Sequence, residues 1–238
     1  MQFLLDNLIS VVVAGVLILV LQAGQIRTRH ADIEQVTSHS VKAKTLIFGR
    51  WVEDDVLNIG ANFGTNLYRF EAPVLEAVTD NALRWEFYSD STRNDGTKSR
   101  IFKRYRLVKK AVAQFSQPQA TFQLYRVERD SVVVDYSPSG AAPTLAGLAE
   151  SSWVRSGNSI ETVSFFKVEL LDRFGREPLT ASGDIDVLKA DYIRIRFGVV
   201  PEYVLSTDGG SRGNTLRELY WSKTLKVRPY WVPPPSQS

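Results

Sequence analysis

Hydrophobic residues are unevenly distributed along the chain, and the first thirty residues contain the longest apolar stretch. Residues 8–23 read LISVVVAGVLILVLQA. With the apolar residues before it, this stretch approaches the ~20 residues that a membrane-spanning helix needs. Farther on, apolar residues recur at roughly helical spacing as far as Trp51. We therefore predict one long helix from Leu4 to about Asp55, with a transmembrane part in residues 1–25 and an amphipathic continuation in residues 26–57.

Charged residues flank the apolar stretch, and their positions indicate whether it is a membrane anchor and how it is oriented. Asp6 falls in the first two turns, where a carboxylate interacts favourably with the helix dipole and can stay at headgroup level. A cleaved secretory signal, the main alternative, needs a basic segment before its apolar part. Basic residues instead follow the stretch, at Arg27, Arg29, Lys42 and Lys44. The positive-inside rule therefore places the C-terminal part in the cytoplasm.

After Gly60 the pattern changes to short alternating or continuously apolar segments between turn signals, which is typical of an antiparallel sheet. Residues 89–99 are predicted as a polar loop, and Glu128–Asp130 as the turn of a second hairpin. Asp172–Gly175 is predicted as a turn that ends a further strand. The predicted strands are Leu83–Tyr88, Arg100–Ala111, Thr121–Val127, Ser131–Tyr136, Thr162–Leu171, Tyr192–Val200 and Leu219–Val227.

These segments define the expected domain organisation. A β-rich head covers residues 58–231, and residues 141–158, rich in Ala, Gly, Ser and Pro, form a loop or short helix that divides it into two lobes. Residues 232–238 form an extended, proline-rich tail. The predicted fold class is α+β, with a long N-terminal helix packed on a predominantly antiparallel β head.

Composition and motifs point away from catalysis. The chain contains no cysteine, which excludes disulfides, zinc–thiolate sites and a cysteine nucleophile. His30 and His39 are separated by more than two helical turns and cannot share a metal ion. Glu53–Asp55 is interpreted as a solvated helix face, and Asp90–Asp95 as a solvated loop rather than a calcium site. We expect no catalytic residue, metal or cofactor.

The strongest local charge signal lies in the second predicted strand. Arg100, Lys103, Arg104 and Arg106 are interleaved with aromatic residues. Such a strand is a candidate for binding a polyanion such as nucleic acid. The alternative, which we favour, is a solvent-facing edge strand, where basic residues discourage aggregation.

The order of these features resembles the minor pilins and pseudopilins of type IV pili and type II secretion systems, in particular the large W/J-type subunits. Those proteins have an acidic residue near the start of a hydrophobic N-terminal helix, followed by an amphipathic continuation. The motifs that carry the resemblance are LIFGRWVEDDVLNIG at residues 46–60, FKRYRL at 102–107, LYR at 124–126, and the strand and LLD turn at 168–175.

The resemblance implies a structural filament subunit that is anchored in a bacterial inner membrane by a single span and exposes its head in the periplasm or outside the cell. Its partners would be other pilin-like subunits and the membrane. The family's basic leader is not visible here and aspartate replaces its glutamate. Either the leader was already removed, the start is misassigned, or this is a divergent pilin-like protein that is not processed. Asp6 would pair with the N-terminal amine of a neighbouring subunit. The expected assembly residues are Phe3, Asp6, Leu8, Ala14 and Gly15.

Two other functions stay open from the sequence. One is a membrane-tethered binding or adhesion module that does not polymerise. The other is a membrane-anchored enzyme of unfamiliar type, which lacks a recognisable nucleophile–base or metal constellation.

Overall fold

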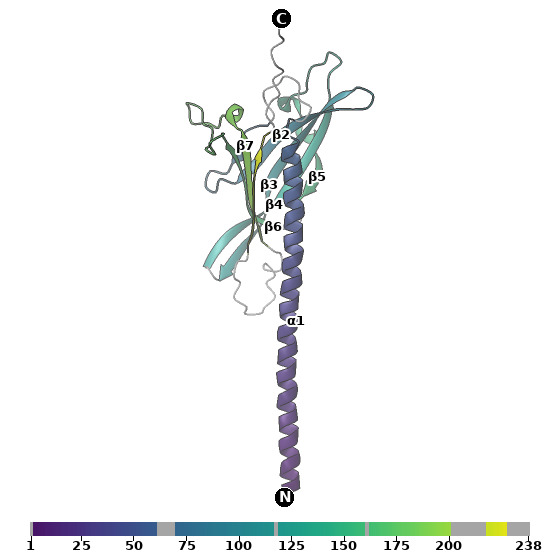
Figure 1. Ribbon diagram of the computed structural model, residues 1–238, viewed down its shortest axis with the longest axis vertical. Coiled ribbons are helices and arrows are strands. Elements are labelled where there is room, and N and C mark those ends of the chain that lie inside the picture. Colours follow the sequence, from purple (N-terminus) through teal and green to yellow (C-terminus); the bar gives the residue numbers. More distant parts are fainter. Residues whose placement is uncertain (1, 61–69, 117–118, 160–161, 201–217, 228–238) are drawn as a thin grey trace. The chain divides into compact units, whose positions relative to one another are not determined.

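The computed structural model describes residues 2–60, 70–116, 119–159, 162–200 and 218–227. It contains one long helix, α1 (Gln2–Leu57), and an antiparallel β sheet (Figure 1). The predicted α+β class is therefore confirmed. The chain divides into two compact units, Met1–Ala43 and Lys44–Ser238, which we describe separately. The predicted tail at residues 232–238 lies outside the described residues.

The first unit consists of the N-terminal part of α1. Within it, Ser10–Arg29 is long and apolar enough to cross a membrane, and none of this stretch is buried. Its valine, leucine and isoleucine side chains are more than half exposed, as Val11 and Leu21 illustrate at 72% and 65%. This segment is compatible with a membrane anchor, and a signal sequence near an N-terminus would meet the same criteria of length and hydropathy.

In the second unit, the described strands form one sheet in the order β1-β2-β3-β4-β6-β7-β8, with β5 paired to β4. Each neighbouring pair is antiparallel. The predicted strands 162–171 and 192–200 are confirmed as β6 and β7. The strands are β1 (Val74–Leu75), β2 (Ala82–Thr92), β3 (Lys98–Ser116), β4 (Gln119–Asp135), β5 (Val154–Asn158), β6 (Thr162–Leu171), β7 (Tyr192–Val200) and β8 (Leu219–Lys226).

Two predicted turns differ from the structure. The turn predicted at Glu128–Asp130 is wrong, because β4 runs through these residues without a break. The loop predicted over residues 89–99 is shorter, since β2 continues to Thr92 and β3 begins at Lys98. Between them, the amide of Arg93 donates to the carbonyl of Thr97 at 2.9 Å. Gly96 adopts a φ of 83° there, which favours glycine.

Residues 141–158 return to the sheet. They contain two 3-10 turns, η1 (Leu145–Gly147) and η2 (Glu150–Ser152), followed by β5. Because β5 pairs with β4, the strands before and after this segment belong to the same sheet.

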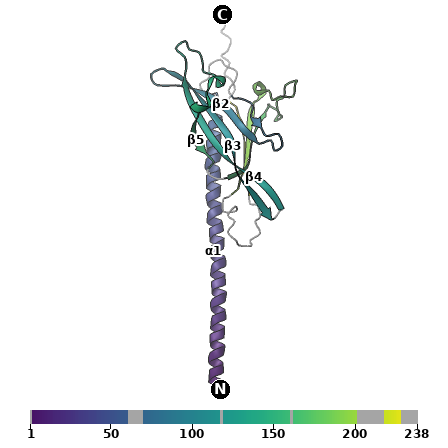
Figure 2. The ribbon, with the colours of Figure 1, turned by 180° about the vertical axis from the view of Figure 1, so that it is seen from behind.

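The last turns of α1 pack on one face of this sheet (Figures 1 and 2). Phe48, Val52 and Val56 are buried at helical spacing, so they form one apolar stripe. The ring of Phe48 meets that of Phe197 on β7 edge to face, with centroids 5.0 Å apart. On the same face, Tyr105 contacts the rings of other strands and extends the aromatic core. The core aromatic residues of the strands include Trp85, Phe87, Tyr105, Phe166 and Phe197.

We expect Phe197→Ala to destabilise the head by about 3–5 kcal/mol, because it removes a fully buried ring that also stacks on Trp221 at 4.9 Å. Phe174→Ala is the matched control, since Phe174 is 70% exposed, and should change stability by no more than about 0.5 kcal/mol. Thermal unfolding of the full chain in detergent, followed by near-ultraviolet circular dichroism, measures both. Equal effects of the two substitutions would contradict this placement of the core.

Candidate functional site: buried charge on both faces of the sheet

Asp55 lies at the contact between α1 and the sheet. Its side chain is 6% exposed, and its carboxylate accepts hydrogen bonds from Lys103 Nζ at 2.6 Å and Tyr105 Oη at 2.6 Å. Arg129 adds two more, from Nε at 2.6 Å and Nη2 at 2.9 Å. Residues 52, 55, 56 and 59 all fall on the buried side of the helix end. Helical spacing from the apolar stripe is therefore the sequence signal that could have identified Asp55 as buried, and the sequence analysis missed it.

The interpretation of Glu53–Asp55 as a solvated face is wrong for Asp55. It holds only for Asp54, which is exposed. Glu53 is partly buried and pairs with Lys223 on β8. The three consecutive acidic residues therefore point in different directions around α1, and each has its own surroundings.

The partners of Asp55 decide its protonation state. Burial alone would raise its pKa, but the hydrogen bonds from Arg129 and the charge of Lys103 outweigh burial and lower the pKa below 3.8. Burial, followed by the charge of Asp55, raises the pKa of Tyr105 well above 10.0. Asp55 is thus an anion and Tyr105 a neutral hydrogen-bond donor at neutral pH.

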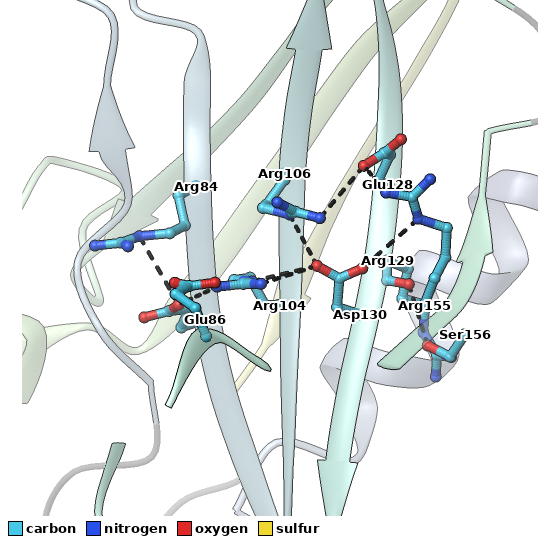
Figure 3. Close-up of polar contacts among 10 residues, drawn as sticks. Arg84, Glu86, Arg104, Arg106, Glu128, Arg129, Asp130, Arg155 and Ser156 are labelled. Carbon is cyan, nitrogen blue, oxygen red and sulfur yellow. Dashed lines mark hydrogen bonds and ion pairs between the residues drawn. The ribbon is translucent and has the colours of Figure 1, made fainter. Parts of the chain in front are cut away.

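A second group of charges lies on the opposite face of the sheet, where β2, β3, β4 and β5 run side by side (Figure 3). Strand alternation explains the placement, because Lys103 and Tyr105 face α1 while Arg104 and Arg106 face away. We call this group the charge cluster. It consists of Arg84, Glu86, Arg104, Arg106, Glu128, Asp130, Glu150 and Arg155.

Arg104 is the centre of the charge cluster and is 2% exposed. Its Nη2 lies 3.1 Å from Asp130 Oδ2, and its Nη1 donates to both carboxylate oxygens of Glu150, at 2.8 and 2.9 Å. The guanidinium group also stacks on the ring of Trp153, with Cζ 4.3 Å from the ring centroid. The connection that follows β4 therefore covers Arg104, which would otherwise be exposed to solvent on β3.

Glu128 and Asp130 explain why the predicted turn is absent. Asp130 is 2% exposed, and its Oδ2 lies 2.8 Å from Nε of Arg106. Glu128 is 6% exposed and pairs with Arg106 and with Arg155 of β5. Each carboxylate is neutralised from neighbouring strands, so a polar sequence continues as a buried strand.

The four predicted polyanion-binding residues are not arranged as one basic row. Arg100, Arg104 and Arg106 face away from α1 and bind carboxylates of the chain, while Lys103 binds Asp55 on the other face. This arrangement does not support a polyanion site on β3. The favoured alternative, an edge strand, is wrong, because β3 lies between β2 and β4.

Arg100 fastens the start of the connection that follows β4. It binds both carboxylate oxygens of Asp90, at 2.8 and 3.2 Å, and donates to the carbonyl of Pro143 at 2.9 Å. The hydroxyl of Tyr136 completes the group, 3.0 Å from Nη2. Arg100 and Arg104 together hold the connection at two points.

Glu86 is the member of the charge cluster whose pairing is weakest. Its side chain is 9% exposed, and its nearest cations are Arg84 and Arg104 at 3.8 and 3.9 Å. Burial raises its pKa above 4.5, and the charges of Arg84 and Arg104 oppose this rise without cancelling it. Glu86 therefore carries a net electrostatic cost when it is ionised in the folded state.

The expected assembly residues all lie on α1. Ala14 and Gly15 are on its exposed part, and no atom lies within 4 Å of where a Cβ of Gly15 would be. The side chains of Phe3, Asp6, Leu8 and His30 lie outside the described part of the structure. Within the described residues, no group of three or more His, Asp and Glu side chains is placed to hold a metal ion.

The chemistry of the two sites is that of fixed ion pairs. In the charge cluster the guanidinium groups and carboxylates are equal in number, so the cluster as a whole carries no net charge when all its members are ionised. Comparisons with protein-family models, with curated proteins and with solved structures find no match to this chain.

We expect Asp130→Asn to lower the free energy of unfolding by about 3 kcal/mol, because it removes the carboxylate that the buried Arg104 shares with the partly buried Arg106. Asp135→Asn is the matched control, since the Asp135 side chain is 49% exposed and forms an ion pair with Arg93 at 3.3 Å at the surface. It should cost no more than about 1 kcal/mol. Urea unfolding in detergent distinguishes them, and a harmless Asp130→Asn would contradict the role of the charge cluster.

Glu86→Gln should stabilise the head at pH 7. The folded-state pKa of Glu86 lies above its unfolded value of 4.5, so the folded state binds the proton more tightly. Stability from this group is present at low pH and is lost as pH rises through the folded pKa. The advantage of the variant should therefore shrink as pH falls toward 4.5.

The measurement is the melting temperature between pH 4 and pH 8, with Glu177→Gln at an exposed position as the control. A Glu86→Gln variant that is less stable than the parent at pH 7 would show that the long pairs with Arg84 and Arg104 outweigh the burial of the carboxylate.

Proposed function

We propose that this chain is a pilin-like structural subunit of a membrane-anchored filament, which assembles through α1 and exposes its β-rich head. The observation that carries the proposal is the composition of α1. One uninterrupted helix combines an exposed apolar segment, Ser10–Arg29, with a C-terminal end that is fixed to a β sheet by a buried carboxylate. A filament subunit requires both properties.

The exposed apolar segment needs a non-aqueous environment. Lipid supplies it for the free subunit, and neighbouring helices supply it in a filament. Ala14 and Gly15 have small side chains, which let two helix backbones approach closely. In a filament core the carboxylate of Asp6 requires a cation, and the resemblance to pilins assigns that part to the N-terminal amine of a neighbouring subunit. Arg27 and Arg29 favour a cytoplasmic head by the positive-inside rule, whereas the pilin hypothesis places the head in the periplasm or outside the cell.

A membrane-tethered binding or adhesion module is the second candidate. The connection between β6 and β7 favours it, because Phe174, Leu179 and Leu188 are 70%, 51% and 53% exposed. Apolar side chains displayed on a connection between strands are suited to contact another protein. Self-assembly through α1 separates the two candidates.

The test is to extract the protein from its native membrane, sediment it, and determine its mature N-terminus by intact mass and terminal-peptide analysis. We expect a polymer with a processed start. Asp6→Asn should abolish the polymer while membrane insertion persists, since it removes the only negative charge proposed for the helix contact. Asp32→Asn, at an exposed position of α1, is the control. A monomeric protein with an unmodified Met1 would favour the tethered binding module.

A further inference from the structure

The outer face of β7 carries two arginines that share one carboxylate. Phe197 is buried against Phe48 of α1. Strand alternation therefore places Arg194 and Arg196 on the opposite face, where their side chains are 39% and 42% exposed. Both form ion pairs with Glu169 on β6, Arg194 through Nε and Nη2 and Arg196 through Nη2. The two guanidinium groups thus lie close together at the surface of the head.

Glu169 does not satisfy both arginines. A guanidinium group has more N–H donors than one carboxylate has acceptor sites, so two guanidinium groups on a single carboxylate leave donors in excess. In addition, Nε of Arg196 is buried and has no hydrogen-bond partner among the described residues. The charge cluster differs, because its arginines and carboxylates are equal in number. An external anion can therefore join the pair at Glu169 without displacing that carboxylate.

The strand register places hydroxyl groups beside the arginine pair. Thr224 on β8 is opposite Arg194, and Ser222 is opposite Arg196. Both hydroxyl residues are exposed. Directly opposite side chains on one face of a sheet have Cβ atoms about 5 Å apart. The hydroxyl groups can therefore donate hydrogen bonds to an anion that the arginines hold.

A lysine on β6 adds positive charge next to the pair. Lys167 is opposite Arg196 on the side away from β8. Its Nζ lies 3.8 Å from Asp80 Oδ2, and the side chain of Asp80 is 75% exposed. An ion pair of this length with an exposed carboxylate is weak, so Lys167 contributes to the positive potential over β7.

An exposed aromatic ring lies on the same face, one row farther along the strands. Tyr220 on β8 and Phe165 on β6 are both opposite Gly198, which follows Arg196 by two residues. Tyr220 is 71% exposed, its ring centroid is 5.8 Å from that of Phe165, and its hydroxyl donates to Glu218 at 2.6 Å. Rows on one face of a strand are roughly 7 Å apart. An organic group attached to an anion at the arginines can therefore reach the ring.

We propose that Arg194 and Arg196 form a binding site for the oxyanion of a phosphate or sulfate monoester. Their planar guanidinium groups donate to the oxyanion, and Ser222 and Thr224 add hydroxyl donors. The ring of Tyr220 contacts the organic part of the ester. Nucleic acid fits this face less well, because the carboxylate of the arginine pair repels a second phosphate of a continuous backbone. The inference goes beyond the filament hypothesis, and its test does not require assembly.

The test measures binding of sugar esters to the full chain in an uncharged polyoxyethylene detergent. Saturation-transfer NMR titrations give the dissociation constants of glucose 6-phosphate and glucose 6-sulfate, and glucose is the neutral control. We expect the esters to bind and glucose not to bind. Inorganic phosphate should compete, but more weakly than the esters, because it makes no contact with Tyr220. Binding of one ester alone would identify phosphate or sulfate as the oxyanion that the site selects.

Arg194→Gln and Arg196→Gln should each raise the dissociation constant at least about tenfold, the loss expected for a charge-assisted hydrogen bond. Either variant leaves Glu169 with one arginine, so the head should stay folded. Arg93→Gln is the matched control, because it removes the same charge from a side chain that is 52% exposed on the turn between β2 and β3. Arg194→Lys keeps the charge without the planar fork, and should raise the dissociation constant at least about threefold.

Three results would overturn the proposal. The first is that neither ester binds the parent chain. The second is that Arg93→Gln weakens binding as much as the substitutions in the arginine pair, or that Arg194→Lys binds as tightly as the parent, since diffuse charge would then explain the affinity. The third is that oligothymidylate binds more tightly than the sugar esters with a salt dependence of several phosphates, which would make the face a nucleic-acid surface.

Discussion

The head depends first on the buried carboxylate of Asp55. An unpaired carboxylate in this position would cost several kcal/mol, so the contact between α1 and the sheet is favourable only when Lys103 and Arg129 reach it. Apolar side chains such as Phe48 and Val52 would tolerate a small rotation of the helix, because dispersion contacts are not directional. The ion pairs of Asp55 would not tolerate such a rotation, because they are directional. A shift of one residue along the helix moves a side chain by about 100° around its axis. Asp55 therefore fixes the orientation of the helix end on the sheet.

On the other face of the sheet, buried carboxylates also require cationic partners, but the partners there come from neighbouring strands and a connection. There the carboxylates of Glu128 and Asp130 are buried under a connection rather than under a helix, and Arg104 links the strands to that connection through Glu150. Buried pairs of this kind contribute little net stability compared with an apolar core, but any wrong register leaves a charge unpaired. The charge cluster consequently selects one pairing of β2, β3, β4 and β5.

The sequence predicted those elements whose patterns are local. The long helix, β6 and β7 follow from apolar spacing and alternation alone. The prediction failed where polar residues are buried, because Glu128 and Asp130 look like a turn until Arg106 and Arg155 are known to lie on neighbouring strands. The prediction of a polyanion-binding strand from the basic residues of β3 failed to anticipate their arrangement for the same reason, since their partners Asp90 and Asp130 lie on other strands. For Asp55 a local signal did exist, because its spacing from Val52 and Ile59 matches the buried stripe.

This distribution of charge limits where the molecule can bind a partner. The arginines of the charge cluster have little to offer an external anion, because displacing an internal pair exposes a buried charge. Exposed apolar surface, by contrast, is present on Ser10–Arg29 of α1 and on the connection that bears Phe174 and Leu179. A head whose register is fixed by internal ion pairs can present such surfaces without changing shape. The buried ion pairs of the head therefore act on its strand register, whereas its exposed apolar residues are the surfaces left for contact with lipid or protein.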